Sequence, residues 1–105
     1  MTDKINIIAN LLNIFNFETL TVGTTVKSLT SSIYIDSNGA YAKKALITIE
    51  TASLRWRCDD NPTSTVGHLM QPGDILTLIG SANIRNFKAI RTGATSAKIS
   101  ISYSL

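Results

Sequence analysis

The last eleven residues, from Thr95 to Leu105, alternate almost perfectly between apolar and polar side chains. The apolar positions are Ala97, Ile99, Ile101, Tyr103 and Leu105, and the positions between them from Lys98 onward are lysine or serine. Successive side chains of an extended chain point to opposite faces, so a period of two indicates a strand with one buried and one solvated face.

Similar segments occur along the chain, separated by Gly, Pro, Asn and Asp. The predicted strands are Phe17–Val22, Val26–Leu29 as its possible partner, a weaker Ile33–Ile35, Ala45–Thr51, Leu54–Cys58, Ile75–Ile79 and Phe87–Arg91. Short strands spaced by about ten residues favour an antiparallel sandwich over an α/β fold. The predicted fold class is therefore mainly β: a single antiparallel β-sandwich, jelly-roll-like, with a short N-terminal helix.

Three connections have recognisable turn chemistry. Asn38-Gly39 predicts a tight turn because both residues tolerate a positive φ, and Pro72-Gly73 fits a type II turn. The link Ala52-Ser53 is minimal, so the strands on either side form a hairpin or one bent strand. Gly80–Arg85 predicts a single helical turn.

The first residues show a different period. Apolar side chains recur at spacings of three and four, which is typical of one face of a helix: Ile5, Ile8, Leu11, Leu12 and Phe15. We divide the chain into residues 1–16, an N-terminal helix or arm, and residues 17–105, the β-sandwich domain. The helix could cover the core of the domain or dock on a neighbouring molecule, and the pattern favours neither.

Length and charge restrict the partners. A chain of 105 residues forms one domain, and charged residues make up 16% of it, against about 25% in typical domains. A thinly charged surface suits a subunit packed against copies of itself, so we expect a homo-oligomer. The net charge of +3 contains no basic run longer than Lys43-Lys44, which argues against nucleic-acid binding. The start of the chain resembles neither a signal peptide nor a membrane span, so we expect synthesis in a cytoplasm and no membrane partner.

A catalytic site would have to use the one histidine and the one cysteine. His68 and Cys58, with Asp59 or Asp60 nearby in the sequence, contain the residue types of a nucleophilic site. The alternation of the strand, however, places Cys58 on the buried side with Trp56, where a thiol behaves as a small apolar group. We therefore predict no catalytic residues and a non-enzymatic protein.

Two other features admit a binding role. Asp59, Asp60 and Asn61 offer oxygen ligands for calcium, but the segment lacks the spaced acidic pattern of a calcium loop, and a turn explains it because Asp and Asn bond their own backbone. Trp56 between two arginines could stack on a base or a sugar, but the alternation favours a core position. We predict no metal and no cofactor.

The polar loop Asp59–Thr65 and the turn Asp36–Ala40 are instead expected to make contacts with partners. The candidate contact residues are Asp59, Asp60, Asn61, Asn38 and Tyr41.

The segment from Ala45 to Tyr103, with the motifs Ala-Leu-Ile-Thr-Ile-Glu-Thr-Ala, Leu-Arg-Trp-Arg-Cys-Asp-Asp-Asn-Pro-Thr and Asn-Ile-Arg-Asn-Phe-Lys-Ala-Ile-Arg-Thr-Gly-Ala, resembles small β proteins encoded among the virion genes of tailed bacteriophages and prophages. Phe17–Val22 is similar to the start of such proteins, and many relatives carry Asp-Gly where this chain has Asp60-Asn61.

The resemblance implies a structural protein located in the virion, in contact with other virion proteins, with capsid decoration or cementing as the first expectation. The alternatives are a tail or head–tail structural protein, or a module that binds host-surface glycans or a receptor through Trp56, Tyr34, Tyr41 or Tyr103.

Overall fold

The computed structural model describes residues 13–105, and the chain there is mainly β. The strands are β1 (Ile14–Val22), β2 (Lys27–Ser28), β3 (Lys44–Glu50), β4 (Leu54–Arg57), β5 (His68–Met70), β6 (Ile75–Ile79), β7 (Lys88–Arg91) and β8 (Ala97–Ser104). Two short helices, α2 (Ser31–Tyr34) and α3 (Ser81–Asn86), connect them. Among the described residues, neither helix is long and apolar enough to cross a membrane.

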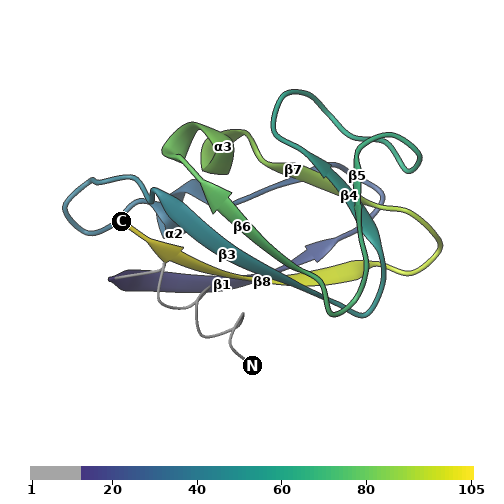
Figure 1. Cartoon of the computed structure of the whole chain (residues 1–105), viewed down its shortest axis with the longest axis horizontal. Helices are drawn as coiled ribbons and strands as arrows, with labels where there is room; N and C mark the ends of the chain where they lie inside the picture. Colours follow the sequence, from purple (N-terminus) through teal and green to yellow (C-terminus); the bar gives the residue numbers. More distant parts are fainter. Residues whose placement is uncertain (1–12) are drawn as a thin grey trace.

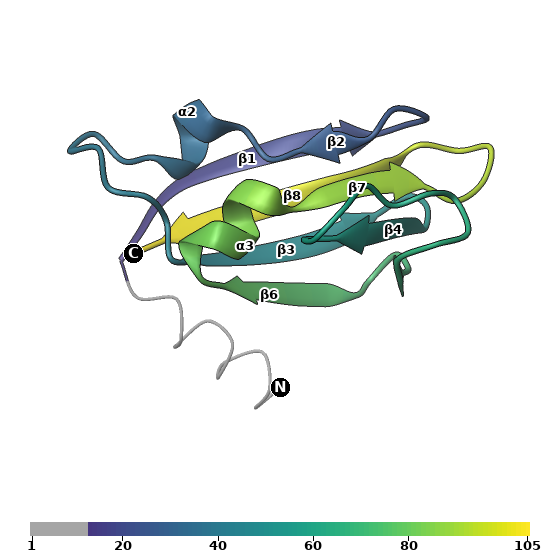
Figure 2. The same ribbon diagram turned by 90° about the horizontal axis from the view of Figure 1, so that it is seen from above.

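The strands form two four-stranded antiparallel sheets (Figures 1 and 2). The first sheet has the order β1-β8-β3-β6, and the second sheet has the order β2-β7-β4-β5. Within the described chain, β1 and β6 are therefore the edge strands of the first sheet. The prediction of a mainly antiparallel β domain is confirmed, in a sandwich-like arrangement.

Side chains from both sheets meet in one core. The largest fully buried side chains include Tyr103, Phe87, Ile47, Leu54 and Ile101. Along β8 the four predicted inward residues, from Ala97 to Tyr103, are at most 1% exposed, whereas Leu105 lies beyond the strand and is 43% exposed. The alternation is thus confirmed from Ala97 to Tyr103, whereas Ser104, predicted on the solvated face, is fully buried.

A partly buried hydrogen bond joins β1 and β8, which are neighbours in the first sheet. The Tyr103 hydroxyl donates to Glu18 Oε2 at 2.6 Å, and the same oxygen accepts the backbone N–H of Thr30 at 3.1 Å. Burial raises the pKa of Tyr103 well above its usual value, and the hydrogen bond to Glu18 adds to the shift. The carboxyl group of Glu18 therefore links Thr30, which directly precedes α2, to Tyr103 near the end of β8.

One predicted strand pairing is wrong, and of the two alternatives for the strands around Ala52-Ser53 the hairpin is excluded. Val26–Leu29 contributes only β2, which pairs with β7 in the second sheet and not with Phe17–Val22. The strands on either side of Ala52-Ser53 do not form a hairpin, because β3 lies in the first sheet and β4 in the second. Thr51 takes a φ of 72° where the chain passes from one sheet to the other. In both cases the two segments that follow each other in the sequence lie in different sheets, on opposite sides of the core that they share.

Two further local predictions need correction. Ile33–Ile35 is not a strand, since the backbone N–H groups of Ile33 and Tyr34 both bond to the Thr30 carbonyl and form α2. The first strand begins at Ile14, so Phe15 lies in β1 and not on a helix. The rest of the predicted N-terminal helix, in residues 1–12, lies outside the described residues.

Other local predictions are confirmed. The helical turn expected over Gly80–Arg85 is α3, and the Pro72-Gly73 turn has Gly73 at a φ of 93° with Asp74 N–H donating to the Gln71 carbonyl at 2.9 Å. Gly39 takes a φ of 84°, and its N–H closes the Asp36–Ala40 turn on the Asp36 carbonyl. These turns depend only on local backbone chemistry, which is why the residue types predict them.

Candidate interaction site

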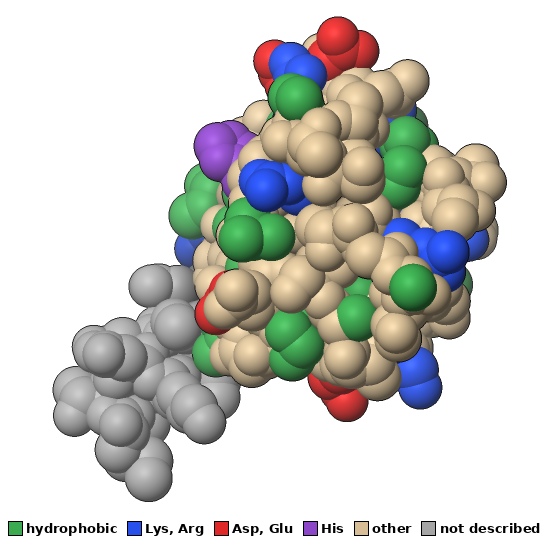
Figure 3. Space-filling model, turned by 90° about the vertical axis from the view of Figure 1, so that its right-hand side faces the viewer, with side chains coloured by type: hydrophobic (Ala, Val, Ile, Leu, Met, Phe, Trp, Pro, Cys, Tyr) green, Lys and Arg blue, Asp and Glu red, His purple; other side chains and the backbone are tan. Residues whose placement is uncertain are grey.

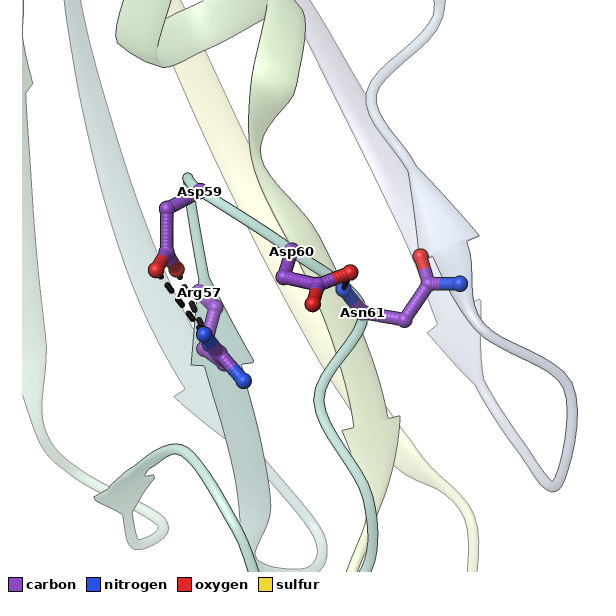
Figure 4. Close-up of polar contacts among 4 residues, drawn as sticks. All are labelled: Arg57, Asp59, Asp60 and Asn61. Atoms are coloured by element: carbon purple, nitrogen blue, oxygen red, sulfur yellow. Dashed lines mark hydrogen bonds and ion pairs between the residues drawn. The ribbon is translucent and has the colours of Figure 1, made fainter.

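The predicted contact loop begins with an ion pair between Arg57 at the end of β4 and Asp59 (Figure 4). Arg57 Nε donates to Oδ1 of Asp59 at 2.9 Å, and Nη2 donates to Oδ2 at 2.8 Å. This two-bond geometry holds a planar guanidinium against a carboxylate and is the strong form of such a pair. The hydrogen bond from Arg57 lowers the pKa of Asp59 to about 2, and the same bond raises the pKa of Arg57.

We expect an NMR titration of the Asp59 carboxyl carbon to give a pKa of about 2 in the native chain. Arg57→Ala should return that pKa toward the ordinary value of 3.8, because the hydrogen bond from Arg57 is the main cause of the shift. The pair therefore stabilises the loop above pH 3.8, and this contribution is lost as the pH falls through 2. Arg85→Ala, which removes a guanidinium at Tyr41 instead, should leave the Asp59 titration unchanged. An ordinary pKa for Asp59 in the native chain would contradict the pair.

The next two residues have their polar groups in the turn itself. Asp60 Oδ1 accepts the backbone N–H of Asn61 at 2.7 Å, and the Asn61 side chain extends away from Arg57 and Asp59 (Figure 4). Among residues 13–105, no group of three or more His, Cys, Asp or Glu side chains could hold a metal ion. The oxygen atoms of Asp59 and Asp60 thus serve an ion pair and a turn, which supports the turn interpretation of this segment.

The rest of the loop is bonded to the second sheet through the side chain of Arg55. Arg55, on β4, donates from Nη1 to the Gly67 carbonyl at 3.0 Å and from Nε to the Ser64 carbonyl at 3.2 Å. Pro62 is buried, and the Thr63 and Val66 backbones bond to each other across the tip. The loop is therefore held to β4 by hydrogen bonds, and its tip, with Val66 53% exposed, is presented to solvent.

A shallow hollow of about 410 Å³ lies beside this loop. It is lined by Thr24, Pro62, Thr63, Ser64, Ile90, Arg91, Thr92 and Gly93. Figure 3 views the molecule from this end, where basic side chains are separated by polar and hydrophobic ones and do not gather into one patch. Arg91 in the lining already donates to the Ser96 hydroxyl at 3.3 Å, so its guanidinium is partly engaged within the fold.

The other two predicted contact residues lie elsewhere. Asp36 Oδ1 accepts the backbone N–H groups of Asn38 and Ala40, which leaves the Asn38 side chain exposed at the turn. Tyr41 is 42% exposed, and the Arg85 guanidinium lies 5.4 Å from the centre of its ring. The turn after α2 and the loop between β4 and β5 project from opposite ends of the molecule (Figures 1 and 2). The five predicted contact residues therefore form two separate groups.

Of the two residues of the nucleophilic alternative, Cys58 packs against the core and His68 is exposed beside Trp56. The Trp56 ring stacks on Phe87 with 5.8 Å between centroids and lies 4.7 Å from His68, so Trp56 packs against the core as the alternation predicts. The Cys58 thiol donates to the Asn83 carbonyl at 3.4 Å, and burial raises its pKa. A raised pKa keeps the thiol protonated at neutral pH, which makes it a poor nucleophile.

A second surface was not identified from the sequence: the outer face of the first sheet. Register places Phe17, Ser102, Leu46 and Thr77 in one row across it, and Thr19, Ser100, Thr48 and Ile75 in the next. Neither row contains a charge, and Phe17 and Ile75 within them are 56% and 38% exposed. The rows on either side are charged: one pairs Ile79, 61% exposed, with Lys44, and the other pairs Glu50 with Lys98. The sequence signal for this surface was that β6 has apolar residues on both faces: Leu76 and Leu78 on one, and Ile75 and Ile79 on the other.

Comparison of the chain with protein-family models, curated proteins and solved structures finds no match.

Proposed function

We propose that this chain is a jelly-roll subunit that works by assembling, as a non-enzymatic structural protein of a tailed-phage virion. Its setting is the capsid surface, where copies decorate or cement the shell. The observation that carries the proposal is the strand order of the two sheets, combined with the two uncharged rows on the outer face of the first.

The strand order supports the jelly-roll assignment. Along the chain, β1 to β4 alternate between the first and second sheets, and after the β4–β5 hairpin β6 to β8 alternate again. This winding wraps paired strands around one core and yields the orders β1-β8-β3-β6 and β2-β7-β4-β5. Eight strands in two such sheets characterise jelly rolls, which viral capsid proteins and lectins use.

The surface chemistry favours assembly over recognition of a small ligand. The two uncharged rows on the first sheet combine hydroxyl groups with the exposed Phe17 and Ile75 side chains, a composition suited to burial against protein. A rigid sandwich with short loops also keeps such a surface in one geometry, as a repeated lattice contact requires.

A glycan-binding role finds less support from the aromatic residues. Tyr34 and Tyr103 are buried, and Trp56 stacks on Phe87. Tyr41 is exposed, but the Arg85 guanidinium lies over its ring. The aromatic side chains that could form a sugar platform are thus engaged within the fold.

Purified particles test the proposal. We expect quantitative mass spectrometry of gradient-banded virions, and of capsids separated from their tails, to find this chain in the capsid fraction in many copies per particle. Its presence in separated tails alone would contradict the capsid setting and support the tail alternative. Its absence from banded particles would contradict a structural role.

A further inference from the structure

One edge of the first sheet is left open by the described chain. β6 pairs with β3 on one side only, and within residues 13–105 no strand pairs with its other side. The strand Ile75–Ile79 contains no charge and no proline. Natural edge strands are commonly protected by charges, prolines or bulges, since an unprotected edge recruits another strand.

Register shows which backbone groups face this edge. Gly80 N–H donates to the Lys43 carbonyl, and Ile49 N–H donates to the Asp74 carbonyl, so the even-numbered positions of β6 are those bonded to β3. The N–H and C=O groups of Ile75, Thr77 and Ile79 consequently point outward. Asn83 Nδ2 donates to the Ile79 carbonyl at 2.9 Å, so this carbonyl is directed away from β3 and already accepts one hydrogen bond within the fold.

We propose that β6 pairs with β6 of a second copy, antiparallel about Thr77, to make one continuous sheet across two subunits. The inference rests on the assembly function proposed above and identifies its contact. Ile75 of each copy lies opposite Ile79 of the other, and the two Thr77 residues face each other on the two-fold axis. Such a contact is closed and uses the same surface on both subunits.

Charge complementarity favours a second copy as the occupant. The same register places Asp74 of one copy opposite Gly80 of the other, and Gly80 is itself paired with Lys43. Asp74 and Lys43 of the partner then share one face, about 10 Å apart between Cα atoms, with Gly80 between them and the Asn83 amide 3.8 Å from where a Gly80 Cβ would lie. Both residues are exposed, and the two-fold axis repeats the contact. Opposite charges therefore meet at both ends of an otherwise uncharged strand.

Disulfide capture tests the register. In a Cys58→Ser background, Thr77→Cys should form a covalent dimer under mild oxidation, because Cα atoms of a hydrogen-bonded antiparallel pair lie about 5.5 Å apart, within the range of disulfides. Thr21→Cys is the matched control: Thr21 is an exposed threonine on β1, at the opposite edge of the same sheet. We expect this control to remain monomeric on denaturing gels.

Charge reversal tests the ends of the contact. Lys43→Glu places a carboxylate next to Asp74 of the partner at both ends, so the dimer dissociation constant should rise about tenfold at low salt. Lys27→Glu changes the net charge equally, but on the edge strand β2 of the second sheet, and should leave the constant unchanged. Circular dichroism checks that each variant is folded.

The outcomes separate this inference from the proposed function. Capture at Thr77 together with weakening by Lys43→Glu supports the β6 contact. Self-association that persists in Lys43→Glu, without capture at Thr77, overturns the β6 contact but leaves assembly through another face. A covalent Thr77→Cys dimer of a chain that is absent from virions would support the contact and contradict the virion role.

Discussion

Phe87→Ala should lower the free energy of unfolding by roughly 3–5 kcal/mol, the usual cost of removing a buried aromatic ring. Phe87 is 1% exposed and lies between α3 and β7, with its ring stacked on Trp56 at 5.8 Å. The substitution would leave a cavity in the core beside Trp56, because Phe87 is fully buried and the Trp56 ring stacks on it. Urea denaturation followed by circular dichroism measures the change.

The chain offers a matched control in Phe17→Ala. Phe17 is 56% exposed on the outer face of the first sheet, so the same substitution should cost roughly 0.5 kcal/mol or less. Both variants must be compared at one protein concentration, since self-association adds to the apparent stability. Equal losses for Phe87 and Phe17 would contradict the assignment of the core.

Gly67→Ala should cost roughly 2–4 kcal/mol, because backbone strain and a steric clash act together. Gly67 has a φ of 136°, and a Cβ there would lie 3.2 Å from the Cβ atoms of Arg55 and Pro62 and from the Trp56 carbonyl. Arg55 and Trp56 belong to β4 and Pro62 to the loop that follows it. A side chain at position 67 would therefore force the loop and β4 apart. Thermal unfolding of the variant measures the loss.

Two other glycines separate strain from clash. Gly73→Ala introduces a side chain at a φ of 93° into open space, so it should cost roughly 1 kcal/mol from strain alone. Gly93→Ala meets neither a positive φ nor a close neighbour and should be nearly neutral. A loss at Gly67 no larger than that at Gly73 would show that the loop is not packed as described.

Local features of this fold could be predicted from the sequence. The alternation over Ala97–Tyr103 and the position of Trp56 follow from the two-residue period of a strand, and the Pro72-Gly73 turn follows from backbone preferences. The pairing of strands could not be predicted in this way. β2 finds its partner β7 about sixty residues along the chain, and alternation says which side of a strand is buried but not which sheet it joins.

The same limit applies to the candidate site. The polarity of Asp59–Thr65 indicates an exposed loop, yet the ion pair of Asp59 depends on β4 ending at Arg57. Ile75–Ile79 can be predicted as a strand, but its position at an edge follows only from the complete strand order. The exposure of Ile79, the most exposed apolar side chain of this strand, could therefore not be predicted from the sequence.

Sedimentation velocity of the full chain over a range of micromolar concentrations tests most directly whether this protein acts by joining copies of itself. We predict a species with a mass that is a multiple of 11.4 kDa and a population that grows with concentration. A single sedimenting species of 11.4 kDa at every concentration would contradict self-assembly and, with it, the β6 contact.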